Sequence, residues 1–306
     1  MSLDLAAIQA AHVRIRPHIV RTPVLRSTEL DEAAGGKLFF KCENLQVAGA
    51  FKSRGAVNAV FSLSDAEAAH GVATHSSGNH AAAVARAAQL RGIPAYIVMP
   101  ITAPKAKIRN VGRYGGWIRF CESNLAAREE ACARVVAETG AALIHPFDDY
   151  AVMAGQGTAV LELLEETPEL DAVLCPVGGG GLLCGTAVAA KATRPGIEVF
   201  GVEPAQADDV AQSFRAGRRI SIPSPATIAD GLRTNCTGEK NLPIIRQYAD
   251  GILTVSEDAI RTAMSRLTET LHVEIEPSAA VPYAAILEGK ISVAGRRIGL
   301  ILTGGN

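Results

Sequence analysis

The sequence predicts an α/β fold in which two lobes each hold a mainly parallel twisted sheet flanked by helices. Short apolar runs alternate with segments of helical spacing along most of the 306 residues. The runs are rich in β-branched residues and lack polar alternation, which is typical of strands buried on both faces. No long linker and no repeat of 20–50 residues interrupts this alternation. Strand and helix in regular succession therefore favour a doubly wound parallel architecture.

Each expected element rests on its own pattern. Strands are expected where apolar runs of about four to six residues occur, at residues 71–75, 95–99, 117–120, 142–144, 172–175, 199–202, 251–254 and 298–302. Helices are expected in the longer segments between them, where apolar residues recur at helical spacing or alanine dominates, at residues 80–91, 125–139, 154–166, 181–193 and 257–270.

Composition and charge exclude several classes of protein. Apolar residues make up 48% of the chain and charged residues 20%, and 30 basic residues face 31 acidic ones. This balance lacks the basic surface of nucleic-acid-binding proteins, so we expect no nucleic-acid partner. The six cysteines contain no CxxC pair, which argues against a zinc ribbon or a dense disulfide framework. No wholly apolar stretch reaches 18 residues and the N-terminus lacks a basic region, so we expect a cytoplasmic protein with no membrane partner.

Lys52 is the candidate catalytic residue. It lies between Phe51 and a run of small residues, a poor place for a charge whose only role is solubility. Taken alone this setting is weak, because most lysines lie at the surface with the charged end in water. The hypothesis gains weight from three other motifs of the chain.

Four consecutive glycines, residues 178–181, follow an expected strand and precede an expected helix. In that position successive backbone N–H groups can surround a phosphate, and the helix N-terminus adds positive potential. The stretch satisfies neither GxGxxG nor the Walker pattern, because Leu183 or Cys184 stands where a glycine is required and Thr186 where a lysine is required. A tight turn is the alternative interpretation.

A polar loop, Ser76, Ser77, Gly78, Asn79 and His80, joins another strand to a helix. Hydroxyls and free N–H groups at a helix start suit an anion such as a substrate carboxylate. Asn79 could also bind a ring hydroxyl, and His80 is interpreted as structural rather than catalytic. Simple N-capping is the alternative for one such residue.

These motifs together resemble fold-type II pyridoxal-phosphate enzymes of the serine/threonine dehydratase and serine racemase family. Residues 51–56 resemble the Schiff-base motif of that family, residues 76–80 its substrate-carboxylate loop and residues 178–181 its phosphate loop. Residues 303–306, Thr-Gly-Gly-Asn, resemble the motif that faces the pyridine nitrogen. Their order and spacing hold from about residue 15 to the end of the chain.

The resemblance implies a tryptophan synthase beta-like fold, with a large cofactor-binding domain of residues 1–68 and 148–306 and a small substrate-binding domain of residues 69–147. It also implies a homodimer with pyridoxal 5'-phosphate as cofactor. The implied cofactor-binding residues are Phe51, Lys52, Asn79, Gly178, Gly179, Gly180, Gly181 and Thr303. The implied substrate-binding residues are Ser76, Ser77, Asn79, His80 and Arg128.

The implied reaction is β-elimination from a small β-hydroxy amino acid to give a 2-keto acid and ammonia. Lys52 would hold the cofactor and then remove the Cα proton. Serine, threonine and 3-hydroxyaspartate remain open as substrates. Ser77 occupies a position where racemases and hydroxyaspartate dehydratases tend to carry serine, and it could deliver a proton on the face opposite Lys52. Racemisation of serine or aspartate is therefore the alternative function.

Two further features resemble the racemase branch. Residues 203–209 resemble a divalent-metal segment, with the Glu203 and Asp209 carboxylates and the Ala207 carbonyl as implied ligands. These hard oxygen donors suit Mg²⁺ or Ca²⁺, and an acidic surface turn is the alternative. Arg128 could meet a second substrate carboxylate through its guanidinium fork, although a helix-surface arginine remains as plausible an interpretation.

Overall fold

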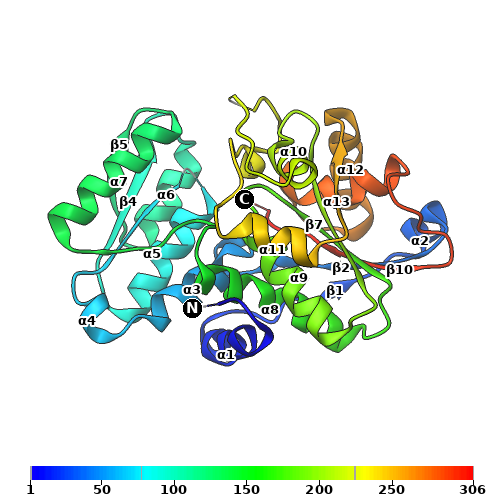
Figure 1. The fold of residues 1–306 in the computed structure, drawn as a ribbon, viewed down its shortest axis with the longest axis horizontal. Helices are drawn as coiled ribbons and strands as arrows, with labels where there is room; N and C mark the ends of the chain where they lie inside the picture. Colours follow the sequence, from blue (N-terminus) through cyan, green and yellow to red (C-terminus); the bar gives the residue numbers. More distant parts are fainter. Residues whose placement is uncertain (1, 77, 224, 306) are drawn as a thin grey trace.

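The chain folds into two lobes that lie side by side, each built around its own sheet (Figure 1). The structure is a computed structural model and describes residues 2–76, 78–223 and 225–305. Both lobes combine helices with parallel strands, so the predicted fold class is confirmed. No described helix is long and apolar enough to cross a membrane.

The larger sheet has six strands in the order β1-β2-β10-β7-β8-β9. Every neighbouring pair is parallel except β1 with β2. The strands are β1 (Val24–Leu25), β2 (Lys37–Lys41), β7 (Ala172–Pro176), β8 (Glu198–Pro204), β9 (Gly251–Val255) and β10 (Arg297–Ile301).

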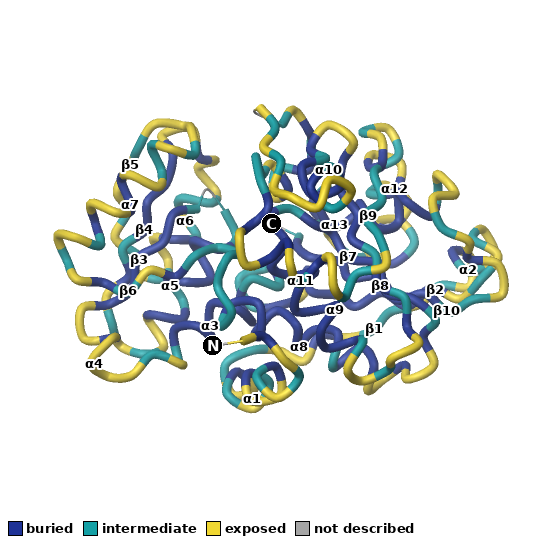
Figure 2. The backbone as a smooth tube through the Cα atoms, in the orientation of Figure 1, coloured by how far each residue is buried: buried dark blue, intermediate teal, exposed yellow. Residues whose placement is uncertain are grey.

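Helices cover both faces of this sheet, which explains why its central strands are apolar without alternation. Leu38 and Phe40 point to one face and pack with α2 (Thr28–Ala34), α12 (Glu257–Leu271) and α13 (Pro277–Leu287). Phe39 points to the other face, where the cover is α1 (Leu5–Ile15), α8 (Tyr150–Glu166), α9 (Gly181–Thr193), α10 (Asp209–Ala216) and α11 (Asn241–Tyr248). Figure 2 shows the resulting buried layer between exposed helix surfaces.

The smaller sheet has four parallel strands in the order β5-β4-β3-β6. They are β3 (Val72–His75), β4 (Ala95–Pro100), β5 (Trp117–Cys121) and β6 (Ala142–Leu143). The helices α5 (Asn79–Arg91) and α6 (Lys105–Arg113) share a core with one face, and α7 (Leu125–Thr139) covers the other. The short α4 (Asp65–Ala68) precedes β3, and one-turn 3₁₀ helices lie at Arg16–His18, Glu43–Leu45, Val47–Gly49 and Asp230–Leu232.

The helix α3 (Lys52–Ser62) lies between the lobes and carries the candidate lysine at its first position. Its Val57 and Val60 belong to the core of the small lobe, and its other side crosses α8. The crossing is close, since a Cβ added to Gly155 would lie 2.5 Å from the carbonyl oxygen of Arg54. Both lobes therefore fix the position of α3.

The strands and helices expected from the sequence are all present. The helix expected from residue 154 begins at Tyr150, because the Asp149 side chain caps it by accepting hydrogen bonds from the Ala151 and Val152 N–H groups. The pattern did not reveal β1, β2 or the helices α1, α2, α3, α4, α6, α10, α11 and α13. The domain boundaries at residues 68/69 and 147/148 stay a prediction.

Candidate active site

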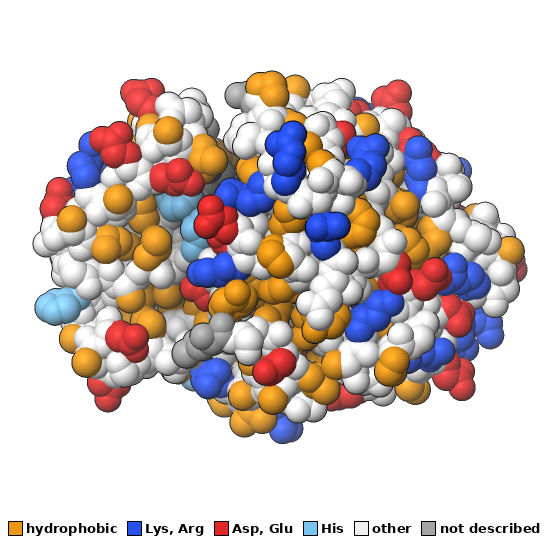
Figure 3. Space-filling model, in the orientation of Figure 1, with side chains coloured by type: hydrophobic (Ala, Val, Ile, Leu, Met, Phe, Trp, Pro, Cys, Tyr) orange, Lys and Arg blue, Asp and Glu red, His pale blue; other side chains and the backbone are white. Residues whose placement is uncertain are grey.

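A pocket lies between the two lobes, at the carboxyl ends of β3 and β7. Open parallel sheets bind ligands at these ends, because the loops that follow the strands converge there. The loops after β3 and β7 line the pocket together with residues 230–236 from the large lobe. Figure 3 shows the surface hollowed between the lobes, with histidine side chains in the hollow and charged side chains at its rim.

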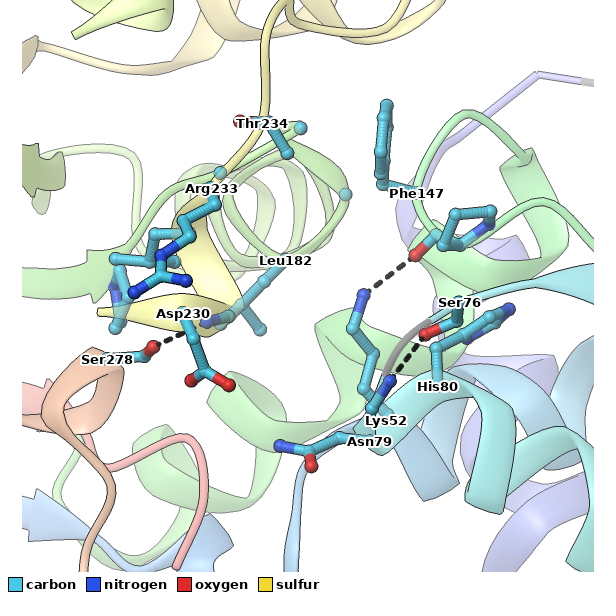
Figure 4. Close-up of a pocket in the computed structure, with 18 of the residues that line it drawn as sticks. Lys52, Ser76, Asn79, His80, Phe147, Leu182, Asp230, Arg233, Thr234 and Ser278 are labelled. Atoms are coloured by element: carbon cyan, nitrogen blue, oxygen red, sulfur yellow. Dashed lines mark hydrogen bonds between the residues drawn. The ribbon is translucent and has the colours of Figure 1, made fainter. Parts of the chain in front are cut away.

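Lys52 extends into this pocket (Figure 4). Its Nζ donates a hydrogen bond of 2.7 Å to the Pro146 carbonyl oxygen and lies 5.1 Å from the centre of the Phe51 ring. Burial lowers the pKa of Lys52 to about 8, against a smaller opposing effect of Glu276. Near neutral pH a fraction of this amine is therefore unprotonated and nucleophilic.

A buried ionic cluster supports α3 directly behind Lys52. The Arg54 guanidinium donates to Glu43 at 2.7 and 2.8 Å and to Glu162 at 2.7 and 2.8 Å. Lys41 donates to Glu162 at 2.7 Å and to the Thr22 carbonyl at 2.6 Å. Two cations thus face two carboxylates in a site with almost no solvent exposure, and the cluster joins α3 to β2 and α8.

The glycine run lines the pocket wall opposite α3, between the end of β7 and the start of α9. Among the hydrogen bonds of the described chain, none has a backbone N–H of residues 178–181 as its donor. A Cβ on Gly179 would lie 2.3 Å from the Phe147 ring, and Gly180 adopts φ +105°. Side chains are thus excluded by space and conformation, and the free N–H groups at the N-terminus of α9 suit an anion.

The polar loop lies at the start of α5, where the sequence predicts a carboxylate site, and it lines the pocket. The Ser76 hydroxyl accepts a hydrogen bond of 3.2 Å from the Gly78 N–H. Asn79 donates through Nδ2 to both Glu276 oxygens at 3.1 and 3.2 Å. His80 is buried, with Nε2 3.3 Å from the Ile144 carbonyl oxygen, and burial lowers its pKa. Ser77 lies outside the described residues.

Thr303 follows β10 and also lines the pocket. Its backbone carbonyl accepts from the Phe51 N–H, which joins the end of the chain to the start of α3. Its hydroxyl Oγ1 is buried and has no hydrogen-bond partner in the described part of the chain. A buried hydroxyl without a partner is costly, and an aromatic ring nitrogen in the pocket would satisfy it.

Arg128 lies on α7 and lines the pocket from the small lobe. Burial lowers the pKa of its guanidinium, and its Nε has no hydrogen-bond partner within residues 2–76, 78–223 and 225–305. The structure therefore favours a pocket arginine over a helix-surface arginine.

Several pocket residues were not found from the sequence. His75 lines the pocket, and its ring centre lies 5.5 Å from that of His145; burial lowers the pKa of each histidine to about 4. Lys107 of the small lobe and Asp230 of the large lobe form an ion pair of 2.5 Å across the pocket. None of these residues stands in a recognisable motif; a histidine at the end of a strand, as His75 is, was the one available signal.

The implied metal ligands lie apart from the pocket, between β8 and α10. Glu203 Oε1 accepts from the Ala211 N–H at 2.7 Å, and Asp209 Oδ1 accepts from the Thr234 hydroxyl at 3.3 Å. The second oxygen of each buried carboxylate has no hydrogen-bond partner among the described groups. Burial raises the pKa of Glu203 well above its usual range and that of Asp209 to about 7. Ala207 is also buried. The described residues contain no group of three or more His, Cys, Asp or Glu side chains placed so that they could hold a metal ion.

Comparison with known proteins relates this geometry to proteins of named activity. The chain is 50% identical over 308 residues to a serine racemase of Oryza sativa subsp. indica, covering 99% of this chain and 91% of the relative. It is also 50% identical over 297 residues to a beta-hydroxyaspartate dehydratase of Paracoccus denitrificans, covering 97% and 94%.

Solved structures agree with these relatives. A maize serine racemase superposes with a TM-score of 0.97 at 50% identity, covering 100% of this chain and 94% of the other. A serine racemase from Dictyostelium discoideum superposes with a TM-score of 0.95 at 45% identity, covering 100% and 99%, and a threonine deaminase superposes with a TM-score of 0.94 at 44% identity, covering 99% and 98%. The family model described as "Pyridoxal-phosphate dependent enzyme" matches residues 15–304. With this match over nearly its whole length, the chain belongs to the pyridoxal-phosphate dependent enzymes.

Proposed function

We propose that the chain is a dehydratase (ammonia-lyase) that converts a small β-hydroxy amino acid into a 2-keto acid and ammonia. The observation that carries this proposal is the arrangement of the pocket. A partly buried amine of lowered pKa, Lys52, shares the pocket with residues 178–181, whose backbone N–H groups donate no hydrogen bond within the described chain. Relatives named as a beta-hydroxyaspartate dehydratase and an L-threo-3-hydroxyaspartate ammonia-lyase support the reaction class.

The residues present fit pyridoxal phosphate. Lys52 supplies the amine that would hold it, residues 178–181 a cradle for its phosphate, and the unpartnered Thr303 hydroxyl, within the described chain, a partner for its ring nitrogen. Phe51 and Asn79 line the same pocket. When bound, the cofactor supplies an aldehyde that condenses with amines and a ring that accepts the electron pair left at Cα.

Lys52 is proposed as the base that removes the Cα proton. Its pKa of about 8 suits proton transfer near neutral pH, where both its protonated and its free form are populated. Thr303 offers the ring nitrogen a neutral hydroxyl, which does not hold a proton there as a carboxylate would. The weaker electron sink favours expulsion of the β-hydroxyl over transamination.

The substrate carboxylate is proposed to bind at the start of α5. The loop offers the Ser76 hydroxyl and the Asn79 amide at a helix N-terminus, and Ser77 is proposed to bind the carboxylate with them. His80 supports the loop from within, because its side chain is buried against the Ile144 carbonyl and is not aimed at solvent. Arg128 is proposed to bind a second carboxylate, which would favour 3-hydroxyaspartate over serine and threonine.

Racemisation is the second candidate function, and relatives named serine racemase at about half identity favour it. It would use Lys52 and Ser77 as proton carriers on opposite faces of the substrate. In such a site the Ser77→Ala variant would lose racemisation and keep elimination.

An assay of keto-acid release tests both candidates. Both enantiomers of serine, threonine and 3-hydroxyaspartate are supplied separately, and the remaining amino acid is analysed on a chiral column. We expect keto acid from at least one of them and none above background with Lys52→Ala. Arg128→Met should lower turnover of 3-hydroxyaspartate more than that of serine. If no substrate yields keto acid and none changes its handedness, the proposed function is wrong.

Three further properties are proposed. A divalent cation, Mg²⁺ or Ca²⁺, would bind the Glu203 and Asp209 carboxylates and the Ala207 carbonyl, since the carboxylates are buried and each has an oxygen without a partner in the described chain. A homodimer and a cytoplasmic location are proposed from the resemblance to the family, with a small amino acid as the only expected partner besides a second copy of the chain.

A further inference from the structure

Asn241, the first residue of α11, lies directly behind the glycine run and is fully buried. Its Nδ2 donates to the Gly179 carbonyl oxygen at 2.7 Å and to the Phe147 carbonyl oxygen at 3.2 Å. One amide therefore joins the backbone of two pocket loops, the one after β7 and the one before α8. No motif of the sequence points to a role for this residue.

The Gly179 carbonyl is held from one side by three donors. Besides Asn241, the Thr237 hydroxyl and the Gly238 N–H each donate to it at 3.1 Å. In a trans peptide unit the C=O and the N–H point in opposite directions, and the described chain contains no cis peptide bond. Fixing the Gly179 carbonyl toward Asn241 therefore points the Gly180 N–H away from Asn241.

Asn241 also limits the conformation of the neighbouring glycine. A Cβ on Gly180 would lie 3.0 Å from Asn241 Nδ2 and 2.9 Å from Ile245 Cδ1, so both side chains fill the space beside that residue. Gly180 itself adopts φ +105°, a conformation open to glycine. The hydrogen-bonded Gly179 carbonyl, the packing beside Gly180 and its backbone conformation together hold the Gly179–Gly180 peptide in one orientation. A concave row of N–H groups binds an anion only when the N–H groups point to the same side.

The start of α11 does not depend on the Asn241 side chain. Asp148 accepts the Glu239 and Lys240 N–H groups at 3.2 and 2.9 Å and thereby holds the segment that leads into the helix. Asn241 Oδ1, in contrast, is buried with no hydrogen-bond partner in the described part of the chain. Burying an amide oxygen without a partner costs free energy that an apolar side chain would not cost. The benefit of an asparagine at this position is therefore the two hydrogen bonds that its NH₂ group donates.

We propose that Asn241 is a positioning residue that aims the backbone N–H groups of residues 178–181 at the phosphate of the cofactor. It would thereby set the preference of this pocket for phosphorylated over unphosphorylated pyridoxal. The inference rests on the proposed cofactor site. It goes beyond that site by assigning phosphate selectivity to a residue that does not line the pocket.

Paired affinities test the proposal. The full-length chain, freed of cofactor, is titrated with pyridoxal phosphate and separately with pyridoxal, and inorganic phosphate is tested as a competitor of the former. The measured quantity is the ratio of the two dissociation constants. Lys52 reacts with the aldehyde of either ligand, so its contribution to the two affinities cancels in this ratio. In Asn241→Ala we expect this preference to fall roughly tenfold or more, since hydrogen bonds to a charged group are lost. The affinity for pyridoxal should change little.

Two further variants control for loss of folding. Asn58 is a comparable buried amide, whose Nδ2 donates to the Ala151 carbonyl at 2.7 Å away from the glycine run. Asn58→Ala should lower thermal stability and leave the preference for phosphate unchanged. Asn241→Asp keeps the shape of the side chain but removes its NH₂ group, and it should lose the preference even if Asn241→Ala does not fold.

Each outcome separates the inference from the proposed function. If the Asn241 variants weaken both ligands equally, or keep the parent preference, the residue is only structural and the inference is wrong. If the parent chain itself shows no preference for pyridoxal phosphate over pyridoxal, the phosphate site and the proposed function fail instead.

Discussion

Two groups of buried charges lie in the large lobe, and they are stabilised in opposite ways. Behind Lys52, the cations Lys41 and Arg54 face the carboxylates Glu43 and Glu162, and direct hydrogen bonds join all four side chains. Between β8 and α10, two buried carboxylates stand together with no cation beside them in the described residues. The first cluster is balanced and the second is not.

The balanced cluster has a structural role, whereas the unbalanced pair is a candidate binding site. A buried charge is tolerated when it is paired and hydrogen-bonded, so the balanced cluster can serve to hold α3. Unpaired carboxylates keep their protons or bind a cation, and burial raises the pKa of both Glu203 and Asp209. The unbalanced pair is therefore incomplete without a proton or a metal ion.

Removing Arg54 should have the largest effect on this comparison. Arg54→Met leaves Glu43 without its cation and Glu162 with Lys41 alone, so we expect a loss of about 3–5 kcal/mol in the free energy of unfolding. Urea unfolding of the chain measures this loss. The double variant Glu43→Gln/Arg54→Met keeps the Lys41–Glu162 pair and should recover part of the stability.

A surface pair provides the matched control. Arg134 and Glu130 form an ion pair of 2.6 Å with both side chains mostly exposed, and Arg134→Met should change stability little. Equal effects of Arg54→Met and Arg134→Met would show that the buried cluster does not hold the fold.

Adding a divalent cation should stabilise the folded chain through the Glu203 and Asp209 pair. A ligand that binds only the folded chain at 100 times its dissociation constant stabilises it by about 2.7 kcal/mol, so Mg²⁺ or Ca²⁺ should raise the unfolding temperature. Asp209→Asn should abolish this response. In the presence of a chelator that variant should be at least as stable as the parent, because it removes a buried carboxylate.

An unchanged unfolding temperature in either cation would contradict the metal interpretation. The two buried carboxyl groups would then be protonated in place of binding a metal ion.

Lys52 is a third kind of charge, partly buried at the pocket, and its contribution should appear in the pH dependence of stability. Its pKa falls from 10.5 to about 8 in the folded chain, so between these values the unfolded chain binds more protons. Stability of the cofactor-free chain should then rise with pH from about 8 to 10.5. The comparison with Lys52→Met isolates this contribution from other titrating groups, and parallel pH profiles of the two proteins would rule it out.

The repetitive part of the fold could be predicted from the sequence. Apolar runs such as residues 172–175 and 298–302 are strands buried on both faces, and their pattern is unambiguous. The strand β1 has only two residues, and β2 begins and ends with lysine, so neither presents an uninterrupted apolar run. Lys41, the buried lysine at the end of β2, is paired with Glu162, which lies 121 residues away in the chain.

The candidate site divides in the same way. Lys52, residues 178–181 and Thr303 stand in local motifs, and each lines the pocket. Lys107, Asp230 and Asn241 act through partners that are far away in the sequence. No local pattern distinguishes such residues from surface lysines, turn acids or helix-capping asparagines, so only the fold identifies them.

The Lys52 amine is proposed to carry pyridoxal phosphate in this pocket. The most direct test is to reduce the chain with borohydride in the presence of the cofactor, digest it and locate the modified lysine by mass spectrometry. We predict that the phosphopyridoxyl group is found on the peptide that contains Lys52 and is lost in Lys52→Ala. A label on another lysine with Lys52 unmodified, or no label at all, would contradict the claim.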